Sequence, residues 1–270
     1  MARRFRPGRP PPGGPNEPAP VGSYRAGRLT PTRMQSGGEG HPHPTLLSDF
    51  ILGSQDGLVN VLGILLGLVA ASLQPGSHVT SEIILVAGLS ALAAESLSMG
   101  AVAYTSTYSR MRLYRSERER EVREMREVPE LEREEVRVIL REWGYEGEEV
   151  EEMLRRIETK PKAWLDLMMA FELNLSYVPP EAPRRSAWLV GWATVLGHFV
   201  PLVPFFDLQL SLVNAAIWST GLSGIMLFGI GMYEARVTAG SLWRSGVRIM
   251  VIGLASGLAG LVIGHFAAYL

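Results

Sequence analysis

The chain has 270 residues, of which 47% are hydrophobic and 20% charged, and its formal net charge is −1. It contains no cysteine, which excludes disulfides and metal sites built from thiolates. The acidic residues are distributed unevenly, because nineteen of the 27 lie between Glu117 and Glu181. Local patterning is therefore more informative here than the net charge.

Residues 1–44 are rich in proline, glycine and arginine and have almost no apolar periodicity. This composition is typical of a disordered basic tail. The first thirty residues contain no apolar run of the kind found in a secretory signal.

Five later segments are apolar over about twenty residues, the length that crosses a hydrocarbon core of about 30 Å. Backbone groups in lipid must be hydrogen-bonded within the segment, so each is expected to be a helix. The sequence thus predicts an all-α fold with five transmembrane spans, two in residues 45–109 and three in residues 186–270. The segments are Leu46–Leu73, Glu82–Tyr108, Ala187–Phe206, Leu210–Tyr233 and Val247–Leu270.

The arginines predict the orientation of these spans. Seven arginines precede the first span, residues 110–185 contain many more, and the connection between the fourth and fifth spans carries Arg236, Arg244 and Arg248. The two other connections, residues 74–81 and the one around Asp207, carry neither lysine nor arginine. We therefore expect a cytoplasmic N-terminus and an external C-terminus. With no eukaryotic sorting signal in the sequence, a prokaryotic cell membrane is expected, with a vacuolar membrane as the alternative.

Residues 110–185, between the second and third spans, are expected to form a small cytoplasmic helical domain. The Glu- and Arg-rich run Ser116–Glu127 continues the second span and is ended by Pro129. Three shorter helices are predicted after it, each bounded by a glycine or a proline. They are Leu131–Trp143, Gly147–Ile157 and Pro161–Leu173.

Ionisable residues within a span are costly in lipid and are candidates for function. Asp49 and Asp56 lie seven residues apart on one face of the first span, with Asn60 one turn further on. Glu95 and Met99 share a face of the second span. Together these residues could bind a cation or carry a proton. The alternatives are that Asp49 caps a helix and that Asp56 is a packing residue.

Two other features of the spans favour packing over chemistry. His198 in the third span fits a polar packing residue better than a ligand. Small residues four apart favour close helix contact, within the chain or at a dimer seam. These pairs are Gly63 with Gly67, Gly253 with Gly257, and Gly260 with Gly264.

The insert carries acidic and methionine residues at helical spacings, whose carboxylate and thioether groups could together hold a transition metal. They are Glu117, Glu121 and Glu124, Glu132 and Glu135, and Met168, Met169 and Glu172. By spacing alone, however, a Glu/Arg run is typical of a solvated helix with surface ion pairs.

Four segments in order along the chain resemble the vacuolar iron transporter family. The first two are Asp49-Phe-Ile-Leu-Gly-Ser-Gln-Asp-Gly-Leu58 and Ala94-Glu-Ser-Leu-Ser-Met-Gly100, the latter followed by Tyr104. The others are Lys160-Pro-Lys-Ala-Trp-Leu-Asp-Leu-Met-Met169 with Phe171-Glu-Leu173, and Val200-Pro-Leu-Val-Pro204. The resemblance extends from about residue 48 to the end of the chain.

The resemblance implies that iron crosses between the first two spans at a homodimer interface, along a path containing Asp49, Asp56 and Met99. Some family members carry an acid two turns before the methionine, where this chain has Ala91, and here the acid is Glu95, one turn before it. It also implies that the cytoplasmic domain collects metal ions through a set of glutamates and a methionine pair. The matching positions are Glu121, Glu124, Glu132, Glu135, Met168, Met169 and Glu172.

The function we expect is proton-coupled export of Fe²⁺, with Mn²⁺ as a second candidate. The partners expected are divalent metal ions, protons, the bilayer and a second copy of the chain. No nucleic acid, tightly bound cofactor or enzymatic activity is expected. A di-iron ferroxidase would need Glu-x-x-His pairs, and the sequence has no histidine between His78 and His198. A membrane metal sensor or scaffold that docks a partner through the insert is the other alternative.

Overall fold

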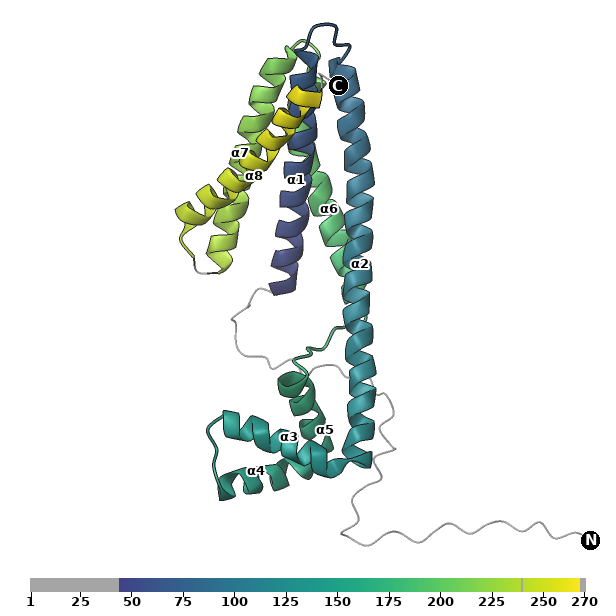
Figure 1. Cartoon of the computed structure of the whole chain (residues 1–270), viewed down its shortest axis with the longest axis vertical. Helices are drawn as coiled ribbons and strands as arrows, with labels where there is room; N and C mark the ends of the chain where they lie inside the picture. Colours follow the sequence, from purple (N-terminus) through teal and green to yellow (C-terminus); the bar gives the residue numbers. More distant parts are fainter. Residues whose placement is uncertain (1–43, 239, 268–270) are drawn as a thin grey trace, which may run out of the picture. The chain divides into compact units, whose positions relative to one another are not determined.

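The computed structural model of the chain describes residues 44–238 and 240–267. The described residues are helical and contain no strand (Figure 1). Apart from Pro44, the predicted basic tail lies outside the described residues. The helices are α1 (Pro44–Ser72), α2 (Ser81–Glu127), α3 (Pro129–Glu142), α4 (Glu148–Glu158), α5 (Pro161–Leu167), α6 (Ala182–Leu202), α7 (Leu212–Val237) and α8 (Leu242–Ala267). A π-helical turn, η2 (Met168–Glu172), follows α5, and a 3-10 turn, η3 (Val203–Phe206), follows α6.

Five of these helices are long and apolar enough to cross a membrane, namely α1, α2, α6 with η3, α7 and α8. The predicted all-α architecture with five spans is therefore confirmed. The third and last spans each begin five residues before the predicted start, at Ala182 rather than Ala187 and at Leu242 rather than Val247. The predicted end of the last span, at residue 270, lies outside the described residues.

Helix α2 is a single helix of 47 residues, which corresponds to about 70 Å at 1.5 Å per residue. It begins after Thr80, whose hydroxyl accepts a hydrogen bond from the backbone N–H of Ile83 at 3.4 Å. It ends at Glu127, two residues before Pro129. The predicted continuation of the second span into the Glu- and Arg-rich run is confirmed. The helix is about twice as long as a hydrocarbon core is thick, and its C-terminal part is the charged one.

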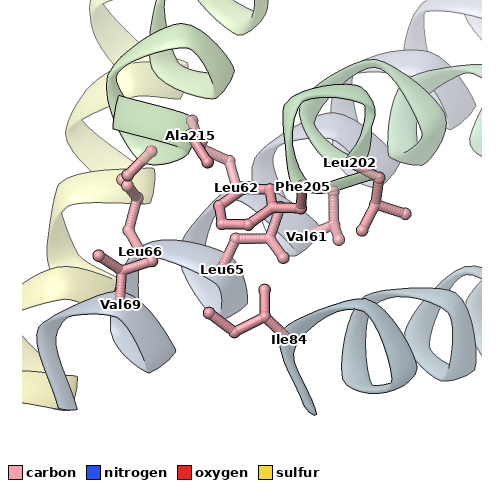
Figure 2. Close-up of a cluster of buried hydrophobic side chains, with 10 residues drawn as sticks. Val61, Leu62, Leu65, Leu66, Val69, Ile84, Leu202, Phe205 and Ala215 are labelled. Atoms are coloured by element: carbon pink, nitrogen blue, oxygen red, sulfur yellow. The ribbon is translucent and has the colours of Figure 1, made fainter. Parts of the chain in front are cut away.

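Helix α1 packs against α2, α6, α7 and α8, so it lies at the centre of the apolar helices (Figure 1). Figure 2 shows the largest buried cluster, in which Leu62 and Leu65 of α1 meet Phe205 of η3 and Ile84 of α2. Pro201 lies in the last turn of α6, and the chain tightens into η3 directly after that turn. This change of helix type positions the Phe205 ring in the core, where it is fully buried.

The glycine pairs pack helices of the same chain together. A Cβ at Gly260 would lie 2.2 Å from the backbone oxygen of Gly63, and one at Gly264 would lie 2.0 Å from that of Gly67. The small residues thus allow α1 and α8 to approach until their backbones touch. This intrachain contact removes the glycine spacing as a reason to expect a dimer seam.

The insert helices α3, α4 and α5 gather near the end of α2 at Glu127 and share a second hydrophobic core (Figure 1). The observed helices begin and end within a few residues of the predicted ones, and the third predicted helix is divided into α5 and η2. The buried residues of this core are Val136, Ile139, Leu140, Val150, Leu154, Trp164 and Met168. Leu131, which fits the same helical periodicity, is instead 57% exposed.

Candidate functional site

The contact between α1 and α2 brings Asp56 and Glu95 together in the apolar part of the chain. Their carboxyl groups lie within hydrogen-bonding range of each other. The side-chain amide of Asn60 lies beside both, donating to Oδ1 of Asp56 at 3.4 Å and to Oε1 of Glu95. Two carboxyl groups in contact repel each other when both are ionised, so the pair requires a proton or a metal ion between them.

Helix α6 contributes His198, a third ionisable residue at the same place. The imidazole is fully buried, and its Nε2 lies 3.0 Å from Oε2 of Glu95. Its Nδ1 lies 3.1 Å from the backbone oxygen of Thr194, one turn earlier on α6. The sequence predicts a polar packing residue at position 198, and the structure adds the contact with Glu95. The sequence signal for such a contact is the position of an ionisable residue in the middle of a span.

The close approach of α1 and α6 explains how the imidazole reaches the carboxyl pair. A Cβ at Gly57 would lie 2.6 Å from both Nδ1 of His198 and the backbone oxygen of Thr194. A Cβ at Gly197 would lie 2.3 Å from the backbone oxygen of Ser54. Only glycine fits at these two positions without moving a helix backbone, so the glycines fix the distance between the two helices.

The two remaining candidates of the spans, Asp49 and Met99, lie apart from these contacts. Asp49 is partly buried and its Oδ2 accepts a hydrogen bond of 2.6 Å from Ser186 of α6. It is seven residues from Asp56 on the same helix, about 10 Å along the axis. Met99 is partly buried on α2, one turn from Glu95. The structure thus places Asp56 and Glu95 in contact. Asp49 and Met99 lie elsewhere on the same two helices, α1 and α2.

The insert contains a second acidic cluster. Glu121 of α2, Glu132 of α3 and Glu172 of η2 each present a carboxylate oxygen, and these oxygens lie within 4.8 Å of one another. Glu121 and Glu132 are each only 2% exposed. Oε1 of Glu121 and Oε2 of Glu132 accept no hydrogen bond from an N–H or hydroxyl group of the described residues. Buried oxygens without partners are costly, which is the arrangement expected where a cation supplies the missing contacts.

Burial and mutual repulsion change the ionisation of these acids. Burial, followed by the contact with Glu132, raises the pKa of Glu121 to about 9. Burial and the nearby Glu135, Glu132 and Glu124 raise the pKa of Glu172 to about 7. Burial also raises the pKa of Glu135. At neutral pH the cluster therefore holds protons that a divalent cation would have to displace.

Other acids of the insert are paired with arginine. Glu134 and Glu151 contact Arg137 at 3.1 and 2.7 Å. Glu124, a candidate ligand, lies 3.2 Å from Arg120. The prediction of a solvated helix with surface ion pairs therefore fits the carboxylates that contact arginine. It does not fit Glu121 and Glu132, which are buried.

The methionine pair lies at the same end of the insert, in the π-helical turn that also carries Glu172. Met168 is fully buried and Met169 is 2% exposed. The backbone N–H of Leu173 bonds to the oxygen of Met168, five residues earlier, at 3.1 Å. Such π turns are rare and occur frequently at functional sites. The turn gives η2 contacts with both α2 and α3, the helices that carry the other two acids.

Comparison of the sequence with known protein families and proteins identifies the family of this chain. Residues 47–265 match the VIT family. The chain belongs to the VIT family. This chain is 33% identical to Vacuolar iron transporter 1 of Arabidopsis thaliana over 208 residues, which cover 77% of this chain and 80% of that protein. It is also 33% identical to Vacuolar iron transporter 1 of Oryza sativa subsp. japonica, over 81% of this chain and 87% of that protein.

A more distant relative is Protein CCC1 of Saccharomyces cerevisiae, 25% identical over 80% of this chain and 67% of that protein. The resemblance expected from the sequence motifs is therefore confirmed at the level of the family. The matched region of this VIT family chain includes both carboxyl clusters, from Asp49 of α1 to Glu172 of η2.

Proposed function

We propose that this chain is a proton-coupled transporter that moves Fe²⁺, and also Mn²⁺, out of the cytoplasm. Metal transport agrees with the names of its relatives, which are vacuolar iron transporters. The observation that carries the proposal is the contact between Asp56 and Glu95 on two apolar helices. Two acids in contact within a membrane span bind a cation or a proton, and exchange between the two couples their movement.

In this proposal Asp56 and Met99 hold the metal during transit, and Glu95 or Asp49 assists with protons. Carboxylates accept a hard divalent ion, and the thioether of Met99 adds a softer donor that Fe²⁺ tolerates better than Mg²⁺. The metal is the transported substrate, and no tightly bound cofactor or enzymatic step is needed.

The acidic cluster of the insert would collect ions before they enter the membrane. Glu121, Glu132 and Glu172 would supply oxygens at the centre, with further ligands around them. The candidate ligands around the centre are Glu124, Glu135, Met168 and Met169. Because burial raises the pKa of Glu121 to about 9, metal binding here would release protons on the same side of the membrane.

We further propose that the insert, residues 110–185, is a cytoplasmic domain between the span pairs 45–109 and 186–270. The arginine-rich connections would then lie inside and the N-terminus would be cytoplasmic. A homodimer that brings two copies of α2 together is part of the same proposal. The host membrane proposed is a prokaryotic cell membrane, with the vacuolar membrane as the alternative.

The test is a flux assay in proteoliposomes that records internal Fe²⁺ and internal pH together under an imposed pH gradient. Coupled transport predicts metal movement that depends on the gradient, with proton movement in the opposite direction. Asp56→Asn and Glu95→Gln should each abolish flux, whereas Glu82→Gln, an exposed acid in the first turn of α2, should not. Flux by the first two variants at the rate of the unmodified protein would rule out this pathway. Folded protein with no flux of any divalent ion would favour a sensor or scaffold.

A further inference from the structure

The imidazole of His198 is held on α6 by a contact of its Nδ1 nitrogen. Its Nδ1 lies 3.1 Å from the backbone oxygen of Thr194. A carbonyl oxygen only accepts hydrogen bonds, so Nδ1 carries the hydrogen in this contact. In a neutral imidazole the second nitrogen, Nε2, then has a free lone pair. Histidines that bind metals in proteins are almost always held in this way, with the other ring N–H donated to a carbonyl or carboxylate.

The lone pair of Nε2 faces a carboxylate oxygen. Nε2 lies 3.0 Å from Oε2 of Glu95, the distance of an ion pair when the imidazole is protonated. In a neutral imidazole with its hydrogen on Nδ1, Nε2 and the carboxylate oxygen both carry electron pairs, so the approach is then unfavourable unless a positive charge lies between or beside them. The His198 side chain is fully buried, and water cannot relieve the repulsion. The contact therefore needs a positive charge between the imidazole and the carboxylate, which either a proton or a bound metal ion can supply.

The position of His198 suits a ligand of the proposed transport site. The imidazole is fully buried, whereas the Glu95 side chain is 20% exposed and Asn60 is exposed. Glu95 also lies within hydrogen-bonding range of Asp56, so it connects the nitrogen donor with the second carboxyl group. Three helices, α1, α2 and α6, thus bring Asp56, Glu95 and His198 together.

We propose that His198 is a nitrogen ligand of the metal ion in the membrane, completing a site with oxygens from Glu95 and Asp56. The inference rests on the proposed function, because it assigns the selectivity of that same transport site. Imidazole binds first-row transition metals well, whereas Mg²⁺ and Ca²⁺ prefer oxygen ligands. The single nitrogen would therefore make the site prefer a transition metal over these two abundant ions.

The test is pulsed electron paramagnetic resonance on the full chain, without a polyhistidine tag, loaded with Mn²⁺. The spectrum should show coupling to a histidine nitrogen, and growth with ¹⁵N-histidine should shift its frequency. The insert cannot produce this signal, because no histidine lies between His78 and His198. His198→Gln should remove the coupling, and the matched change His78→Gln, at an exposed position between α1 and α2, should leave it intact.

Affinity gives a second readout. His198→Gln should weaken Mn²⁺ binding at the membrane site by at least about tenfold, the order found when a metal site loses one supporting group. Ca²⁺ binding should change much less. Glu121→Gln can be combined with each variant, so that binding by the insert does not obscure the membrane site.

Two results would overturn the inference. One is the absence of histidine coupling in the unmodified protein, a measurement that does not depend on whether any variant folds. The other is coupling that persists in His198→Gln. Flux that depends on Asp56 without nitrogen coupling would leave the transport proposal standing and remove the histidine ligand. Nitrogen coupling at His198 in a protein that moves no metal would support the histidine ligand and remove the transport proposal.

Discussion

Glu121 of α2 and Glu132 of α3 lie within hydrogen-bonding range of each other, although each is only 2% exposed. The two acids come from opposite sides of the break at Pro129. The loss of solvation raises the pKa of Glu121 to about 9. This buried pair makes the metal-free insert and its metal-binding chemistry sensitive to pH.

The stability of the metal-free protein should fall as the pH rises from about 5 to about 9. Burial raises the pKa of Glu121 from 4.5 to about 9, so folding favours the protonated form, and this contribution is complete at low pH and lost as the proton leaves. Melting temperatures in chelator across this range would measure the fall. Glu121→Gln should flatten the curve, and Glu142→Gln, an exposed acid on α3, should not. A curve that keeps its slope in Glu121→Gln would contradict the assignment.

Metal binding by the insert should release protons at neutral pH. The pKa of Glu121 is raised to about 9 and that of Glu172 to about 7, so at pH 7 the cluster holds between one and two protons. Calorimetry of Mn²⁺ binding in buffers of different ionisation enthalpy would count them. The count should drop by about one in Glu121→Gln. An unchanged count in that variant would show that the protons come from elsewhere.

The methionine pair should affect the choice of metal more than the stability of the insert. Met168 and Met169 are buried, and leucine has nearly the same volume, so the double change to leucine should cost less than about 1.5 kcal/mol. Loss of the thioethers should weaken binding of Fe²⁺ and Co²⁺ relative to Mg²⁺. Competition titrations with these ions would measure the shift. Equal losses for all the ions would indicate a packing effect alone.

The glycine contact between α1 and α6 should be intolerant of a methyl group. A Cβ at Gly57 would lie 2.6 Å from the backbone oxygen of Thr194, so Gly57→Ala should cost about 1–3 kcal/mol. Gly63→Ala on the same helix is the matched control, because a Cβ there meets nothing within 4 Å. It should be neutral or stabilising, since alanine favours helix by about 1 kcal/mol. Thermal unfolding in detergent compares the two, and equal effects would refute the close contact.

The sequence alone determined the features that depend on local chemistry. Backbone hydrogen bonds in lipid must be made within one segment, so twenty apolar residues were enough to predict each span. Pro129 and Gly144 likewise marked helix ends from their own backbone properties. Asp56 and Glu95 could be selected because an acid in an apolar helix is costly wherever its partner lies.

Tertiary structure alone decided which of these residues meet. The distance from Glu95 to His198, the convergence of Glu121, Glu132 and Glu172, and the pairing of Gly63 with Gly260 all join different helices. Periodicity gives the face of a helix on which a residue lies, but not the neighbour that the face contacts. That choice depends on how the helices pack and rotate against one another, which is set by many side-chain contacts acting together.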